Sequence, residues 1–120
     1  WMIEKLDVTT NPGIREIDVR GDAADLIDLS QSSELESLIC NYSNRKSLNL
    51  SRCNKLTYLE CVGNSHLKKL AVSNNSMLKE VLLEGTELDS KSLKYLRATL
   101  KRNRDYNDDQ DGQLRIEFEI

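Results

Sequence analysis

The sequence has little of the material from which a compact enzyme core is usually built. Of its 120 residues, 38% are hydrophobic and 5% aromatic, and it contains a single histidine, His66. This hydrophobic content is low for a globule with one large core, but it suffices for a stack of coils in which each turn buries a narrow row of side chains. The composition therefore disfavours a compact enzyme fold.

A basic stripe and a long apolar run are also missing. The net charge is −3, with acidic and basic residues interspersed, which disfavours nucleic acid and membrane surfaces as partners. No apolar run approaches the roughly 18 residues of a membrane span, and no signal-peptide pattern opens the chain, so we expect no membrane insertion. Because the sequence begins with Trp1 rather than methionine, we expect a processed product or an excised domain.

Recognisable catalytic motifs are lacking as well. The sequence shows no glycine-rich phosphate loop, nucleophile motif or metal-ligand cluster, and His66 has no cysteine or serine partner at a recognisable spacing. We therefore expect no cofactor and no enzymatic activity, with His66 on the surface. The three cysteines are an odd number and cannot all pair with one another.

What the sequence does contain is a repeat. An apolar-x-x-apolar-x-apolar pattern recurs eight times, and Arg45 is the one charged residue among its 24 positions. Successive starts are 10 or 11 residues apart, a spacing that does not keep the 3.6-residue period of an amphipathic helix. The pattern positions are Ile3, Leu6, Val8, Ile14, Ile17, Val19, Ala24, Ile27, Leu29, Leu35, Leu38, Cys40, Arg45, Leu48, Leu50, Leu56, Leu59, Cys61, Leu67, Leu70, Val72, Leu78, Val81 and Leu83.

A small residue follows each copy of the pattern by two or three positions. Such side chains can turn inward at a bend and bond to the backbone of the neighbouring coil. We expect Cys53, which takes this position in one copy, to lie near the surface. The residues are Asn11, Asp22, Ser32, Ser43, Cys53, Asn64, Asn75 and Thr86.

Alternate copies differ in their residue patterns, so the repeating unit consists of two successive copies and is about 21 residues long. Residues 56–73 read LTYLECVGNSHLKKLAVS. This segment resembles the 21-residue class of bacterial leucine-rich repeats, as in internalin J-like and Bacteroidetes surface proteins, whose unit looks like LTxLxCxxNxLTxLDVSxN. The resemblance covers about residues 3–88, including Cys40 and Cys61.

The resemblance implies a leucine-rich-repeat solenoid, a right-handed, mostly β superhelix with a concave parallel sheet. It also implies protein recognition or adhesion, outside the cell or at a bacterial surface. We expect repeats over 1–88, about four units, and a C-terminal cap over 89–120. In the cap, Asp89 or Ser90 would begin a helix over about 90–103 that packs on the last coil, followed by a strand over about 113–120.

Alternation along the strands assigns the outward side chains. On the copies that start at 14, 35, 56 and 78, the outward residues vary in size and charge, and apolar side chains among them are rimmed by acids. We expect this sheet to be the concave binding face for another protein, because burying such groups against a partner recovers hydrophobic free energy. The alternatives are scattered surface apolar residues, a glycan ligand stacked on Tyr58, or a structural fragment of a longer repeat protein. The expected binding residues are Asp18, Ile39, Tyr58, Glu60, Val62, Glu80 and Leu82.

The N-terminal end enters the pattern without a cap, so we expect further repeats upstream or end-to-end self-association through an open sheet edge. Cys40 and Cys61 should be stacked, buried thiols, with a disulfide or metal pair as the alternative. Asn107, Asp109 and Asp111 resemble the start of a calcium loop, but Phe118 stands where such a loop has its last acid. We expect a solvated acidic turn there, with weak calcium binding as the alternative.

Overall fold

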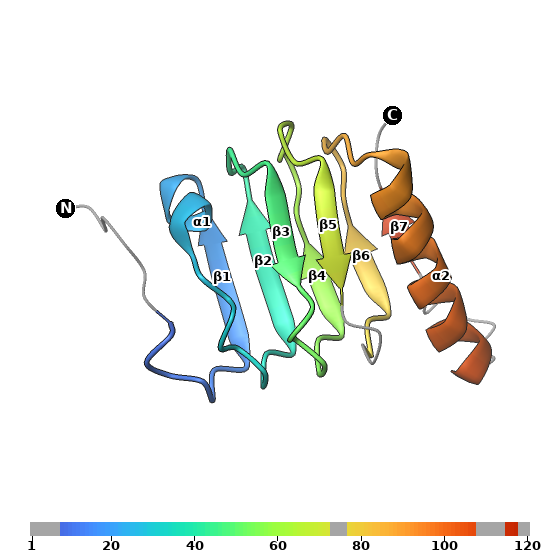
Figure 1. Cartoon of the computed structure of the whole chain (residues 1–120), viewed down its shortest axis with the longest axis horizontal. Helices are drawn as coiled ribbons and strands as arrows, with labels where there is room; N and C mark the ends of the chain where they lie inside the picture. The colour runs from blue at the N-terminus through green and yellow to red at the C-terminus, as the bar shows by residue number, and fades with distance from the viewer. Residues whose placement is uncertain (1–7, 73–76, 108–114, 118–120) are drawn as a thin grey trace.

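The chain folds into a parallel β-solenoid of about three turns followed by a C-terminal helix. The structure is a computed structural model that describes residues 8–72, 77–107 and 115–117 (Figure 1). Its elements in chain order are β1 (Glu16–Arg20), α1 (Asp22–Leu26), β2 (Ser37–Asn41), β3 (Ser47–Leu50), β4 (Tyr58–Glu60), β5 (Lys69–Val72), β6 (Glu80–Leu82), α2 (Ser90–Asn107) and β7 (Arg115–Glu117).

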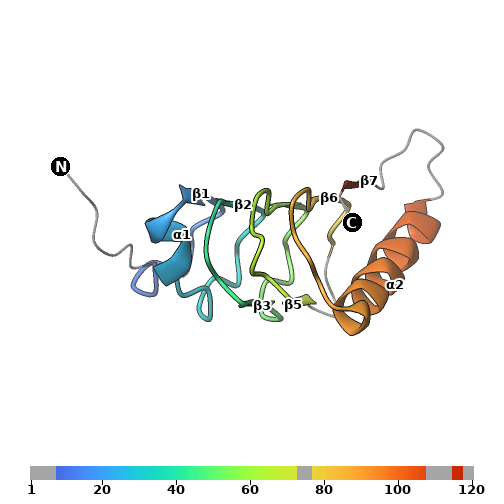
Figure 2. The same ribbon diagram turned by 90° about the horizontal axis from the view of Figure 1, so that it is seen from above.

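The strands form two parallel sheets that the chain visits in turn. Sheet A has the order β1-β2-β4-β6-β7, and sheet B consists of β3 and β5. Seen from above, the two sheets lie on opposite sides of the stack, with the connecting bends at its corners (Figure 2). In sheet A, Glu16 lies beside Ser37 and Ser37 beside Tyr58, which is the 21-residue step of the repeat.

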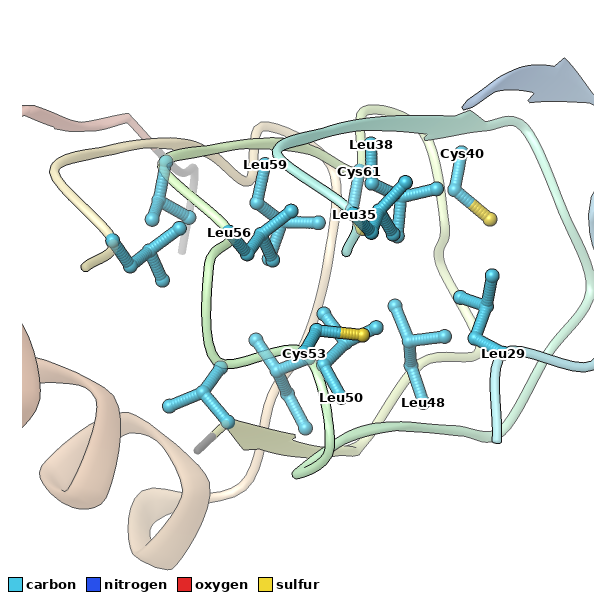
Figure 3. Packing of buried hydrophobic residues seen from close by; sticks show 14 of the residues in the cluster. Leu29, Leu35, Leu38, Cys40, Leu48, Leu50, Cys53, Leu56, Leu59 and Cys61 are labelled. Carbon is cyan, nitrogen blue, oxygen red and sulfur yellow. The ribbon is translucent and has the colours of Figure 1, made fainter. Parts of the chain in front are cut away.

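The apolar residues of successive coils form continuous files inside the stack. Ile17, Leu38, Leu59 and Val81 are register partners across sheet A, and the last three are completely buried. Leucines from the two sheets meet in the interior in Figure 3. The predicted alignment of coils is therefore confirmed, and burial of about 2 kcal/mol per large aliphatic side chain accounts for its stability.

Four of the small polar residues at the bends are buried as the sequence predicts: Ser32, Ser43, Asn64 and Thr86. Asn11 and Asp22 are exposed instead, Asp22 because it begins α1, and Asn75 lies outside the described residues. Asn64 is 1% exposed; its side-chain oxygen accepts a bond of 3.0 Å from the backbone N–H of Ser43, one coil away, and its amide donates to the Cys40 carbonyl at 3.0 Å. Because these backbone groups are buried away from water, each would be costly without a partner. The asparagine side chain thus ties two adjacent bends together.

One predicted coil departs from the pattern. Residues 24–29 were expected as a rung beside β3, but Asp22–Leu26 form the short helix α1 instead. Gly21, with φ 61°, turns the chain out of β1, and the alanine and leucine content of this segment favours helix over strand. Sheet B therefore has two strands in the described part of the chain, and the equivalent rung at 3–8 lies mostly outside the described residues.

Helix α2 caps the stack beside β5. Asp89 accepts a bond of 2.8 Å from the Ser92 N–H, which is the N-cap that the sequence predicts. The Ser92 hydroxyl accepts a hydrogen bond from the Leu70 N–H at 3.2 Å, and the Asp89 N–H donates to the Lys68 carbonyl at 2.8 Å. The start of the helix thus provides partners for backbone groups at the edge of sheet B.

The buried face of α2 and the last strand complete the cap. Leu96 and Leu100 are buried in the core, with Leu93 packed against it. The helix continues beyond the predicted end near 103, to Asn107. Strand β7 lies in the predicted 113–120 segment and extends sheet A by pairing with β6; the rest of that segment lies outside the described residues.

Candidate functional site

The outward side of sheet A, which we call the outer face, is not covered by a described helix. The strands of this sheet run along the upper side of the molecule in Figure 2, and neither described helix lies over them. Its outward positions in the repeat are Glu16, Asp18, Arg20, Ser37, Ile39, Asn41, Tyr58, Glu60, Val62, Glu80, Leu82 and Glu84.

Strand register brings the predicted binding residues together on this face. One row across the strands contains Asp18, Ile39, Glu60 and Leu82. The next row contains Tyr58 beside Glu80.

Val62 follows β4 and lies beside Asn41, whose side-chain oxygen accepts a bond of 2.8 Å from the Val62 N–H. All seven predicted residues therefore belong to one surface. The apolar members are half-buried rather than fully exposed, because side chains on neighbouring strands, about 4.8 Å apart, cover one another.

A hydrogen-bonded cluster fixes the centre of the outer face. The Tyr58 hydroxyl donates to Glu60 Oε1 at 2.5 Å, and the Asn41 amide donates to Glu60 Oε2 at 2.7 Å. These two hydrogen bonds, Tyr58 first, hold the pKa of Glu60 below its ordinary value, with a smaller contribution from the charge of Arg20. Glu60 is therefore an ionised, oriented carboxylate at neutral pH.

Tyr42, just past the end of β2, is an exposed aromatic residue that the sequence analysis did not select. It is 58% exposed, and its N–H donates to the Val62 carbonyl at 2.9 Å. Its φ is 56°, the one positive φ of a non-glycine residue in the described chain, whereas Gly21, Gly63 and Gly85 take the equivalent corners. The signal was present in the sequence as a tyrosine in a row of glycines spaced by the repeat.

The corner at Gly63 explains where the Tyr42 ring lies. A Cβ added to Gly63 would overlap with the Tyr42 ring, so the ring rests directly on the glycine backbone. Gly85 is similarly close to Gly63, with its own added Cβ 3.2 Å from the Gly63 Cα. The absence of side chains at these corners lets the tyrosine ring lie against the stack.

A concave region lies on the other side of the molecule, between sheet B and α2. It is a groove of about 500 Å³ lined by Asn49, Ala71, Lys91, Ser92 and Tyr95, among others. This groove does not follow from the repeat pattern, because the outward residues of this sheet are mostly small and the position of the helix beside them is set by tertiary packing. Lys69 and Asp89 form an ion pair of 3.4 Å at its rim.

Another hollow, of about 540 Å³, opens between β3 and residues 25–30, where the expected rung is interrupted. Arg45 lines it and is already bound to the backbone. Its guanidinium Nη1 donates to the carbonyls of Ala24, Asp25 and Ile27 at 3.2, 3.4 and 2.9 Å. The charged residue in the core pattern thus satisfies carbonyls at the end of α1, where a helix leaves them without partners.

The three cysteines are free thiols in the core. Cys40 and Cys61 lie in adjacent coils, as expected, whereas the expectation of a surface position for Cys53 is wrong, since it is 1% exposed and points into the interior (Figure 3). Burial raises the pKa of Cys40 to about 11, against a smaller lowering by Arg45, and burial raises that of Cys53 to about 11. Burial also raises the pKa of Cys61. Such thiols behave as small apolar groups.

Within the part of the chain that the structure describes, no group of three His, Cys, Asp or Glu side chains could hold a metal ion. Of the calcium candidates, Asn107 ends α2, while Asp109 and Asp111 lie outside the described residues. No helix among the described residues has the length and apolarity to cross a membrane.

Comparison with protein-family models, with curated proteins and with solved structures finds no match to this chain.

Proposed function

We propose that the protein is a recognition module of the 21-residue leucine-rich-repeat class that binds another protein through the outer face. In a solenoid of that class, sheet A would form the concave surface. By the resemblance of its repeat, we further propose an adhesion role at a bacterial surface. The observation that carries the binding proposal is an uncovered parallel sheet whose outward side keeps apolar residues.

Parallel sheets are usually covered on both sides, because their connections place helices over them. Here the inner side of sheet A packs in the core, while no described element covers the outer side. Ile39 and Leu82 nevertheless stand at outward positions, flanking the oriented carboxylate of Glu60. Apolar side chains that stay uncovered on one face and are bordered by charged residues are typical of an interaction surface.

The rigidity of the outer face also supports this proposal. Its backbone is fixed by parallel pairing, and the Tyr58–Glu60–Asn41 bonds fix its central side chains. Binding to a surface that is already ordered costs less conformational entropy than binding to a flexible one. A scaffold or capping segment of a longer repeat protein is the alternative, and it gives no reason to keep apolar side chains on this face.

The test is a selection of displayed protein fragments against the immobilised chain. Selected binders are measured against the double variant Tyr58→Ser/Leu82→Ser and against Met77→Ser, a control that removes an apolar side chain of 54% exposure elsewhere. We expect the double variant to bind at least about 10-fold more weakly, as loss of interface anchors does, while the control binds normally. Circular dichroism and urea unfolding confirm that each variant is folded.

Binders of equal affinity for the wild type and the double variant would contradict the proposal and favour the scaffold alternative. A glycan array that yields a ligand sensitive to the double variant, with no protein binder, would replace the protein partner by a saccharide.

A further inference from the structure

The outer face carries more negative charge than the chain as a whole. Among its outward positions in the repeat, Glu16, Asp18, Glu60, Glu80 and Glu84 oppose one base, Arg20, for a formal charge of −4, against −3 for the entire chain. Strand β7 adds Arg115 and Glu117 at the register positions beside Glu80 and Leu82, and these two charges cancel. The other residues together are therefore close to neutral. A partner of complementary charge would be attracted to this face in preference to the rest of the surface.

The acidic groups surround apolar side chains rather than forming a wholly polar patch. In the central row, Ile39 lies between Asp18 and Glu60, and Leu82 lies on the other side of Glu60. A partner that fits this order presents aliphatic side chains interspersed with cations. The long stems of lysine and arginine can cover Ile39 and Leu82 while their charged heads reach the carboxylates.

Tyr42 offers an anchor for such a cation at the end of the face. A bulky residue with positive φ is uncommon and costs of order 1 kcal/mol, and strain of this kind is often retained where a side chain has a function. The strained backbone places the exposed Tyr42 ring against Gly63. The Tyr42 N–H donates to the carbonyl of Val62, which belongs to the outer face. Lysine or arginine can bind the face of a tyrosine ring by a cation–π interaction.

We propose that the partner presents a basic segment, with lysine or arginine side chains alternating with aliphatic ones, and that Tyr42 is an anchor for it. This inference rests on the proposed function, because it specifies the partner of the same face. The acidic residues supply electrostatic attraction, Ile39 and Leu82 supply apolar contact, and the Tyr42 ring receives a cation at the edge.

The test uses two synthetic 12-residue peptides as probes, one alternating lysine and leucine and one alternating glutamate and leucine. Fluorescence anisotropy should show binding of the basic peptide at least about 10-fold tighter than the acidic one at low salt, and weakening as salt is raised. The variant Tyr42→Gly should bind the basic peptide about 10-fold more weakly. Tyr95→Ser, which removes a tyrosine of 42% exposure on α2, is the matched control and should bind as the wild type does.

Stability measurements separate an anchor from a structural tyrosine. Since glycine accepts a positive φ without strain, Tyr42→Gly should leave the urea midpoint unchanged or raise it while binding falls. A lower midpoint with unchanged peptide binding would overturn the assignment of Tyr42, and equal binding of both peptides would overturn the basic partner. If displayed partners are lost in Tyr58→Ser/Leu82→Ser but carry no basic segment, this inference fails and the proposed function stands.

Discussion

The guanidinium of Arg45 donates to the carbonyl of Ala24 across 3.2 Å, although the two residues are 21 positions apart in the chain. In the repeat they are equivalent positions of successive coils, so an apolar contact would be the ordinary arrangement. Instead, α1 ends at this point and leaves carbonyls facing the next coil. The Arg45 side chain provides hydrogen-bond donors for the carbonyls that α1 leaves unpaired with a neighbouring strand. The charged residue in the apolar pattern is therefore explained by the helix that replaces a strand one coil earlier.

Replacing Arg45 by methionine should therefore lower the free energy of unfolding by about 2 kcal/mol, because a partly buried charged donor to three carbonyls is removed while the stem is retained. Urea unfolding followed by circular dichroism measures the change. Arg52→Met, at an exposed position, should change the free energy by less than about 0.5 kcal/mol. Equal effects of the two substitutions would show that the Arg45 bonds contribute no specific stability.

Removing the Tyr58 hydroxyl should change the pH dependence of stability. Because the folded-state pKa of Glu60 lies below its ordinary value, its contribution is present above the ordinary glutamate pKa of about 4.3 and is lost as the pH falls through the folded-state value. Tyr58→Phe should raise the pKa of Glu60 in carboxyl NMR titrations and lower stability by about 1.5 kcal/mol at pH 7, with a smaller effect at pH 3. Tyr42→Phe is the control, and a Glu60 pKa that is unchanged by Tyr58→Phe would contradict the hydrogen-bond explanation.

The thiols should react only when the solenoid opens. Cys40, Cys53 and Cys61 are about 1% exposed, and burial raises the pKa of all three, so their nucleophilic thiolate form is scarce near neutral pH. Mass spectrometry after iodoacetamide treatment at pH 8 should show labelling at least about 100-fold slower than that of the urea-unfolded chain. Rapid labelling of Cys53 in the folded protein would restore the surface position expected from the sequence.

The regular part of the fold follows from the sequence because each coil repeats the same local requirement. Residues such as Leu38 and Leu59 recur at the 21-residue step, and placing them in one file buries both without any long connection. Residues 22–26 could not be anticipated in this way. Ala24 fits the apolar pattern, but the local helix preference and the Arg45 bonds, which depend on a residue one coil later, decide its conformation.

Some features of the candidate site also follow from the repeat, and others do not. The outward positions of Ile39, Glu60 and Leu82 follow from alternation along a strand, so their common row could be predicted. The arrangement around Tyr42 depends on backbone angles at a corner and on the missing side chain of Gly63. The groove beside Tyr95 depends on how α2 packs on β5. The periodicity of the sequence predicts neither the arrangement around Tyr42 nor this groove.

The bonds of Asp89 and Ser92 to β5 have a consequence for how such a protein can vary in length. Because these bonds go to backbone groups, which every rung offers, a unit duplicated within the stack would present the same groups to the beginning of α2. In a linear array each unit contacts only the units beside it, so extension would add another strand to the outer face and leave the contact between the last strand and α2 unchanged.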